Sequence, residues 1–225
     1  VYMKGIAYRN VPIDLNHGHQ QTLVGMTTFE VIHEDIINEL TQMYPLIRNL
    51  VKEDQSIIEM GFKKWAENII ANGVPHNNWD LFQADFIVKI ALLLQDNQAY
   101  ADGKGKQYYL DYVVNQNSIR QWSLNKLIDF GFDQKAKIWY ESPGYSTTVL
   151  STLCDFANML DEKAEIDMFK QRPILIDGVK ASAEYLFPNR MIAGFGDTHP
   201  GYLNQGGIDN ILKYATRHKN KRLIA

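Results

Sequence analysis

Apolar residues recur at spacings of three and four along much of this chain, and this spacing restricts its fold more than any other feature. The pattern is clearest in three segments, which are residues 56–70, 78–95 and 145–160. In the first, Ile58, Phe62, Trp65 and Ile69 fall on one side of a helix with 3.6 residues per turn. Each segment is therefore predicted to form an amphipathic helix that buries one face.

Weaker helical patterns cover most of the remaining chain. They occupy residues 20–50, 105–130, 162–186 and 206–218. Within the first of these, two helices are expected to meet near Tyr44 and Pro45. No segment alternates apolar and polar residues cleanly over more than four or five positions, so strands are not predicted. The fold class indicated is all-α, built from successive antiparallel helical hairpins.

Three segments are typical of chain breaks. Residues 71–75 predict a helix end, with Gly73 in a left-handed cap and Pro75 just beyond it. Residues 130–144 and 187–207 mix glycine, proline and aromatic residues, which indicates long loops. Binding groups concentrate in such loops, so both loops are candidate binding regions.

Composition excludes several classes of function. The chain has 225 residues, of which 45% are hydrophobic and 22% are charged, with a net charge of -3. Such a balance gives no support for a nucleic-acid or membrane partner, and no apolar run approaches the roughly 20 residues of a membrane span. Cys154 is the only cysteine, which excludes an internal disulfide, and its apolar surroundings predict a buried side chain. We treat residues 1–225 as a single domain.

The first polar cluster is His76-Asn77-Asn78-Trp79, directly before a predicted core helix. Either asparagine is a good N-cap, because its side chain can accept a hydrogen bond from an otherwise unpaired backbone N–H. A cap needs only one asparagine, however, and a helix N-terminus also favours an anionic ligand. The second asparagine therefore remains available as a neutral donor to a carboxylate.

The second cluster is Trp139-Tyr140-Glu141-Ser142-Pro143-Gly144-Tyr145, where a turn leads into a helix. Tyr145 at this junction either packs its ring and leaves its hydroxyl to water, or acts as a proton donor or acceptor. The third cluster places Asp197, Thr198, His199 and Tyr202 in a glycine-lined loop.

A metal site has little support in the sequence. His17 and His19 form an HxH pair, but no third ligand follows at metal spacing. We read the pair as a polar turn at a helix entry. No P-loop or GxGxxG motif is present, so nucleotide binding has no support either. No cofactor is expected.

Taken in order, these clusters resemble the helical domain of heparinase II/III-like polysaccharide lyases. The resemblance rests on four stretches, IDLNHGHQQTLVGMTTFEVI, NNWDLFQADF, ESPGYSTTVL and FPNRMIAGFGDTHPGY. It implies an (α/α) toroid of antiparallel helical hairpins, which a β-sandwich follows in that family. Nothing in this chain is similar to the β-sandwich, so the toroid is expected to be incomplete and the chain to be a fragment of a larger enzyme.

The reaction that the resemblance implies is β-elimination at a uronic acid in an acidic polysaccharide. It assigns Asn78 or Asn77 to the uronate carboxylate and Tyr145 to protonation of the leaving oxygen, and it leaves open whether Tyr145 also abstracts the proton. His199 is the further catalytic candidate. Candidate substrate-binding residues are His76, Trp79, Trp139, Tyr140, Glu141 and Tyr202. The resemblance requires no metal, and it implies export to the periplasm or the cell exterior.

Two alternatives remain open at this stage. An (α/α)-toroid glycoside hydrolase would need two facing carboxyl groups, for which Asp80, Glu141 and Asp197 are the candidates. A non-catalytic carbohydrate-binding helical domain would need neither carboxyl pair nor proton donor. The sequence does not indicate which polysaccharide is bound.

Overall fold

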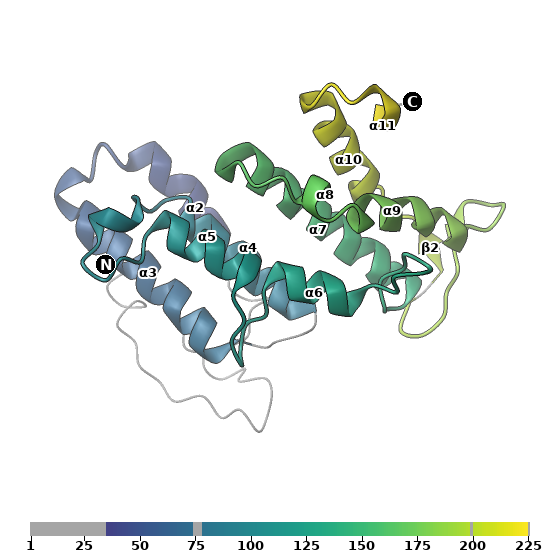
Figure 1. The fold of residues 1–225 in the computed structure, drawn as a ribbon, viewed down its shortest axis with the longest axis horizontal. Coiled ribbons are helices and arrows are strands. Elements are labelled where there is room, and N and C mark those ends of the chain that lie inside the picture. The colour runs from purple at the N-terminus through teal and green to yellow at the C-terminus, as the bar shows by residue number, and fades with distance from the viewer. Residues whose placement is uncertain (1–34, 74–77, 199, 225) are drawn as a thin grey trace. The chain divides into compact units, whose positions relative to one another are not determined.

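The computed structural model describes residues 35–73, 78–198 and 200–224, and the statements below concern these residues (Figure 1). They are mostly helical, as expected, and they do not show a closed toroid. Within them, no helix combines the length and apolarity needed to cross a membrane. The chain divides into two compact units, residues 1–128 and 129–225, which are described separately.

Unit 1 is built around four helices that follow one another in the chain. They are α2 (Asp35–Ile47), α3 (Gln55–Asn72), α4 (Asn78–Ala91) and α5 (Lys106–Asn115). Short 3₁₀ turns, η2 (Lys52–Asp54) and η3 (Asn97–Ala99), lie in the connections. α4 packs against α2, α3 and α5, so it forms the centre of this unit.

The core of unit 1 comes from the apolar faces that the periodicity predicts. Phe62 and Trp65 of α3 are fully buried, together with Ile90 of α4. The burial of large apolar side chains is the main stabilising contribution to such a core. α6 (Leu124–Gly131) carries the chain across the boundary between the two units.

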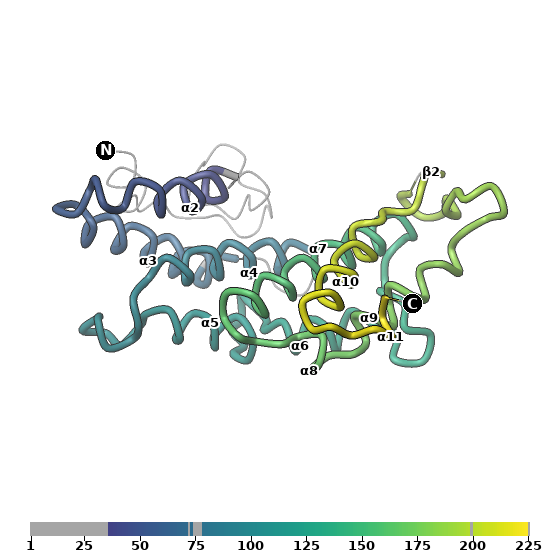
Figure 2. The backbone as a smooth tube through the Cα atoms, turned by 90° about the horizontal axis from the view of Figure 1, so that it is seen from above, coloured from purple at the N-terminus to yellow at the C-terminus, as the bar shows by residue number. Residues whose placement is uncertain are grey.

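Unit 2 is organised around one long helix, α7 (Pro143–Ala164). The elements that follow are α8 (Met168–Gln171), α9 (Ile174–Ala181), η4 (Ser182–Tyr185), β1 (Met191–Ile192), β2 (Gly201–Tyr202), α10 (Gly206–Arg217) and α11 (Lys221–Ile224). α7 contacts α8, α9 and above all α10, which lies alongside it (Figure 2). Cys154 on α7 is fully buried, as predicted, and burial raises the pKa of its thiol to about 12.

Unit 2 also holds a small antiparallel pair of strands that the sequence did not predict. Met191 pairs with Tyr202 and Ile192 with Gly201, within the segment expected to be a loop. Strands of two residues are too short for alternation to appear in the sequence. The hairpin matters because the segment between its strands carries Asp197 and Thr198.

The predicted helices are largely confirmed, with three differences in detail. Residues 105–130 form two helices, and residues 162–186 form three short elements. α2 runs through Pro45 to Ile47, so the expected break at Tyr44–Pro45 is wrong. Pro45 lies in the last turn of α2, so only the end of the helix loses a hydrogen bond, the one that an N–H at this position would donate to the carbonyl of Thr41.

The end of α3 is correctly predicted, but the reason given for Gly73 is wrong. Its φ of -67° and ψ of 175° are extended rather than left-handed. A Cβ atom on this buried residue would lie 2.3 Å from Nε2 of Gln83 and 2.7 Å from the carbonyl oxygen of Arg120. The glycine is therefore needed for close packing, and not for its freedom at positive φ.

We expect Gly73→Ala to lower the free energy of unfolding by about 1–3 kcal/mol, because the backbone of Arg120 cannot yield as a side chain can. Urea denaturation monitored by circular dichroism measures this change. Ser56→Ala, on the exposed first turn of α3, is the control and should stay within about 0.5 kcal/mol of the native protein. Equal stability of the two variants would contradict the packing argument.

Candidate functional site

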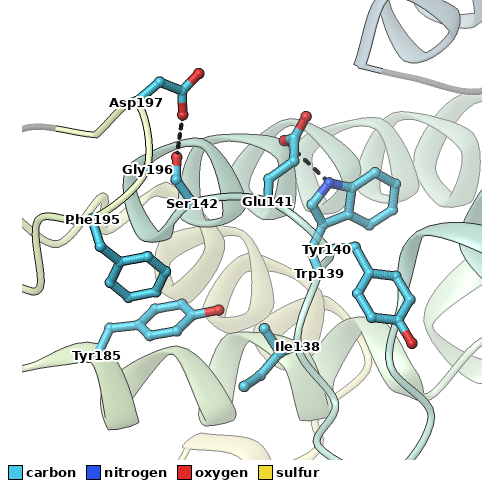
Figure 3. Close-up of a pocket in the computed structure, with 9 residues that line it drawn as sticks. All are labelled: Ile138, Trp139, Tyr140, Glu141, Ser142, Tyr185, Phe195, Gly196 and Asp197. Carbon is cyan, nitrogen blue, oxygen red and sulfur yellow. Dashed lines mark hydrogen bonds between the residues drawn. The ribbon is translucent and has the colours of Figure 1, made fainter.

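A pocket of about 500 Å³ lies in unit 2, where the chain enters α7 (Figure 3). Residues 138–142, Tyr185 and residues 195–197 line it. They come from the segment before α7, from η4 and from the segment between β1 and β2. Among the described residues that line it, two are carboxylates, Glu141 and Asp197, and none is a cation.

Trp139 anchors the first of these segments. Its side chain is only 4% exposed and packs edge-on against Phe132, with ring centroids 5.3 Å apart. A Cβ atom on Gly131 would lie 2.2 Å from the indole ring, so the helix preceding this segment needs glycine there. The indole N–H of Trp139 donates to Oε2 of Glu141 over 3.2 Å. Trp139 thus holds Glu141 in place instead of presenting an open face for stacking.

A chain of hydrogen bonds ties the segment between β1 and β2 to the start of α7. The backbone N–H of Gly144 donates to Oγ1 of Thr198 over 3.2 Å, and Thr198 Oγ1 lies 2.5 Å from Oγ of Ser142. The Ser142 hydroxyl donates in turn to Oδ1 of Asp197 over 2.7 Å. Ser142 occupies the N-cap position of α7, but its side chain makes no capping hydrogen bond and is used in this chain instead.

Two glycines allow these segments to approach so closely. A Cβ atom on Gly144 would lie 2.7 Å from Cγ2 of Thr198. Gly196 has a φ of +69°, a conformation that other residues adopt only with strain, and its Cα faces Ser142. The position of Asp197 in the pocket depends on both.

The surroundings of Glu141 in the pocket shift its pKa. Burial raises the pKa of Glu141 above its usual range, the hydrogen bond from Trp139 opposes this shift, and the negative charge of Asp197 adds to it. In Figure 3 both carboxyl groups point to the upper side of the pocket, and the rings of Tyr185 and Phe195 lie below them. A further negative charge in this space would therefore be repelled.

We expect Thr198→Val to destabilise the loop by about 1–2 kcal/mol. Valine has nearly the shape of threonine but no hydroxyl, so the N–H of Gly144 and the hydroxyl of Ser142 both lose a hydrogen-bond partner. Limited proteolysis should then cut between residues 194 and 201 more readily. Thr152→Val is the matched control, since its hydroxyl only bonds back to Thr148 within α7. Equal protease resistance in the two variants would show that the hydrogen-bond chain does not hold the loop.

The structure places the predicted residues of unit 2 at different distances from this pocket. Tyr140 and Glu141 line it, whereas Tyr145 and Tyr202 do not. Tyr145 is the third residue of α7 and is 45% exposed, so a large ligand can reach its hydroxyl. Tyr202, on β2, is 82% exposed.

In unit 1, Asn78 is the first residue of α4, and both it and Trp79 are half-buried. The capping residue would be Asn77. It lies outside the described residues, as do His76 and His199. Their predicted roles stay predictions.

Asp80 does not suit the role of an exposed catalytic carboxyl that the hydrolase alternative required. It is fully buried in unit 1, where its Oδ1 accepts a hydrogen bond from the backbone N–H of Trp122 over 3.1 Å. Its Oδ2 has no partner among the described residues. Burial raises the pKa of Asp80 from 3.8 to about 8, against the opposing influences of Trp122 and Lys126. Asp80 is therefore a protonated core residue at neutral pH.

Between pH 3.8 and about 8 the folded protein holds a proton on Asp80 that the unfolded chain has lost. The free energy of unfolding should therefore fall as pH rises through this window, by up to about 1.4 kcal/mol per pH unit. Asp80→Asn copies the protonated shape but cannot ionise, so it should flatten this fall. Urea midpoints at pH 5, 7 and 9 measure it, with exposed Asp96→Asn as control. Parallel curves for the native protein and Asp80→Asn would contradict a protonated Asp80.

One group among the described residues has the spacing of metal ligands. Single ligand atoms of Asp161, Asp167 and His218 lie within 4.8 Å of one another. Asp161 Oδ2 already accepts a hydrogen bond from Arg217 over 2.7 Å, and Asp167 Oδ2 accepts one from Tyr214 over 3.0 Å. We interpret the group as an ion-pair network between the end of α7 and α10. His17 and His19 lie outside the described residues.

Sequence reasoning missed Ser142, Tyr185 and Phe195 as lining residues. Ser142 looked like part of a turn, and Tyr185 lies in a segment predicted only as helical. No local pattern signals that η4 and the hairpin segment meet at the start of α7, because they are more than 40 residues away in the chain. The glycine-lined loop, which the sequence did single out, supplies Asp197 and the supporting Thr198.

Part of this chain is similar to a known family of protein domains. Residues 135–225 match the family model described as the second domain of endo-acting ulvan lyase. No curated protein and no solved structure matches the chain. The matched range lies within unit 2 and contains every residue that lines the pocket. Residues 135–225 are thus similar to a polysaccharide lyase domain, and the match does not single out the heparinase II/III-like family.

Proposed function

We propose that this chain is part of a polysaccharide lyase that cleaves ulvan, an acidic, uronate-containing polysaccharide, by β-elimination. The observation that carries the proposal is the match of residues 135–225 to the second domain of endo-acting ulvan lyase. That range includes both the pocket and Tyr145. The resemblance of the Asn77–Asn78 motif to polysaccharide lyases supports the same reaction from a separate part of the chain.

In β-elimination a base removes the proton beside the uronate carboxylate. The electron pair of that C–H bond becomes a carbon–carbon double bond as the adjacent C–O bond to the next sugar breaks. The leaving oxygen takes up a proton. The negative charge that develops next to the carboxylate makes the first step unfavourable unless positioned donors stabilise it.

We assign protonation of the leaving oxygen to Tyr145. Its position in the first turn of the 22-residue helix α7 places the phenol near the positive end of the helix dipole. A phenol can donate a proton and, once ionised, take one up, so the same residue suits either direction of proton transfer. Its 45% exposure leaves the hydroxyl accessible to a polymer.

We assign the uronate carboxylate to Asn78 or Asn77. Asn78 begins α4, and an amide N–H at a helix N-terminus is a suitable neutral donor to an anion. His199 is our candidate for the base. It follows Thr198 directly in the chain, and Thr198 is bonded to the first turn of α7.

Lyase activity should appear as ultraviolet absorbance of an unsaturated uronide when the protein is mixed with ulvan. We expect Tyr145→Phe and Asn78→Ala each to lower the turnover rate at least a hundredfold, because general acid catalysis and charge stabilisation each contribute on that scale. Tyr108→Phe and Asn115→Ala, on the surface of α5, are the matched controls and should keep native activity.

Heparan, hyaluronan, chondroitin and alginate should be tested beside ulvan to establish the substrate class. Absence of unsaturated product from all five polysaccharides would refute the proposal for this chain. Unchanged turnover in Tyr145→Phe would refute the assigned acid while leaving the reaction itself in place.

A glycoside hydrolase remains the second candidate, because Glu141 and Asp197 line one pocket and Glu141 has the raised pKa of a general acid. The two reactions differ in their products. Hydrolysis yields new reducing ends without ultraviolet absorbance, whereas elimination yields both. Reducing-end and absorbance assays on one sample therefore separate them, and the absence of both products with retained binding identifies a carbohydrate-binding domain.

A further inference from the structure

The acidic groups of an acidic polysaccharide do not fit the pocket in front of α7. Its only ionisable carboxyl groups, Glu141 and Asp197, carry the same sign of charge as a uronate or a sulfate, and no cation lines the pocket among the described residues. Both carboxyl groups point to the same side of it (Figure 3). A bound anion would face two like charges without compensation.

The same carboxylates are well placed to accept hydrogen bonds from hydroxyl groups. Glu141 uses Oε2 to accept the indole N–H of Trp139, and Asp197 uses Oδ1 to accept the Ser142 hydroxyl. The other oxygen of each carboxylate accepts no hydrogen bond from the described residues. Each therefore retains acceptor capacity for a donor that enters the pocket. Because one oxygen of each group is already fixed, the second is held in a defined direction.

The remaining surface suits the faces of a sugar ring. Phe195, Tyr185 and Tyr140 contribute aromatic rings, and in Figure 3 they lie around the floor and sides of the pocket below the carboxylates. Aromatic rings offer apolar area to the C–H face of a sugar, while the carboxylates bind its hydroxyl edge. The volume of about 500 Å³ lies within the range usual for small-molecule sites.

We infer that this pocket is a subsite for an uncharged, hydroxyl-bearing sugar unit of the polysaccharide, and that Glu141 and Asp197 reject charged units there. The inference rests on the proposed function in taking a polysaccharide as the ligand. The pocket would thus position the polysaccharide along the site. The neutral unit binds in the pocket, and other donors hold the uronate that reacts. Burial is the main cause of the raised pKa of Glu141, and the charge of Asp197 adds to it, so the pocket disfavours further negative charge.

Two monosaccharides that differ only at the charged group provide the test. Methyl β-glucopyranoside and methyl β-glucuronopyranoside share one ring and its hydroxyls, but only the second carries a carboxylate. Titrations of the full chain at pH 7 can be followed through the indole N–H signal of Trp139 in a ¹H–¹⁵N spectrum, because that group is bonded to Glu141. The neutral glycoside should move this signal saturably and bind at least tenfold more tightly than the glucuronide.

Glu141→Gln keeps the shape of the side chain but removes its charge. It should weaken the neutral glycoside several-fold and reduce the discrimination against the glucuronide, and Asp197→Asn should do the same. Glu184→Gln, at an exposed position of η4, is the matched control. It should change neither the affinity for the neutral glycoside nor the discrimination against the glucuronide. Equal affinity for the two glycosides, or native discrimination in Glu141→Gln, would overturn the inference. A response of Trp139 to calcium chloride alone and not to the neutral glycoside would overturn it as well, in favour of a cation site.

This experiment and the lyase assay fail independently. Binding is read without turnover, so a selective neutral subsite in a chain that forms no unsaturated product would refute the lyase and leave the subsite. Unsaturated product from a chain that does not discriminate between the two glycosides would refute the subsite and leave the lyase.

Discussion

The hydrogen-bond chain that runs from Gly144 through Thr198 and Ser142 to Asp197 is the interaction on which the pocket depends. It joins segments more than fifty residues apart in the chain, and it holds Asp197 beside Glu141. The close approach requires glycine at position 144, because any side chain there would occupy the space of Thr198. The start of α7 thus determines both the helix and the shape of the site in front of it.

The start of α7 also brings two functions near each other in the chain. Glu141 and Ser142 line the pocket, and Tyr145 lies three residues after Ser142, in the first turn of the helix. A rigid helix N-terminus suits both tasks, since it fixes the backbone geometry of the residues around it. The proposed division of labour follows from charge: the carboxylates bind hydroxyl groups, and neutral or positive donors elsewhere hold the acid group.

Much of the fold could be predicted from the spacing of apolar residues. The three strongest segments correspond to α3, α4 and α7, and the core comes from the residues that the spacing selected, such as Phe62 and Trp65. The errors share one cause, which is that local patterns do not report distant neighbours. Position 73 needs glycine because Gln83 and Arg120 leave no room for a side chain, and the two-residue strands form only where the loop closes on itself.

The sequence by itself determined the helices, the turn into α7 and the chemical types present at the candidate site, because periodicity, caps and turns are properties of neighbouring residues. Only the tertiary structure decided which of those types meet. In it, Asp80 is buried in the core of unit 1, and Trp139 holds Glu141 through a hydrogen bond. It also brought Asp197 and Phe195 to one pocket with residues 138–142. Such encounters depend on how distant elements pack, and no local pattern encodes that packing.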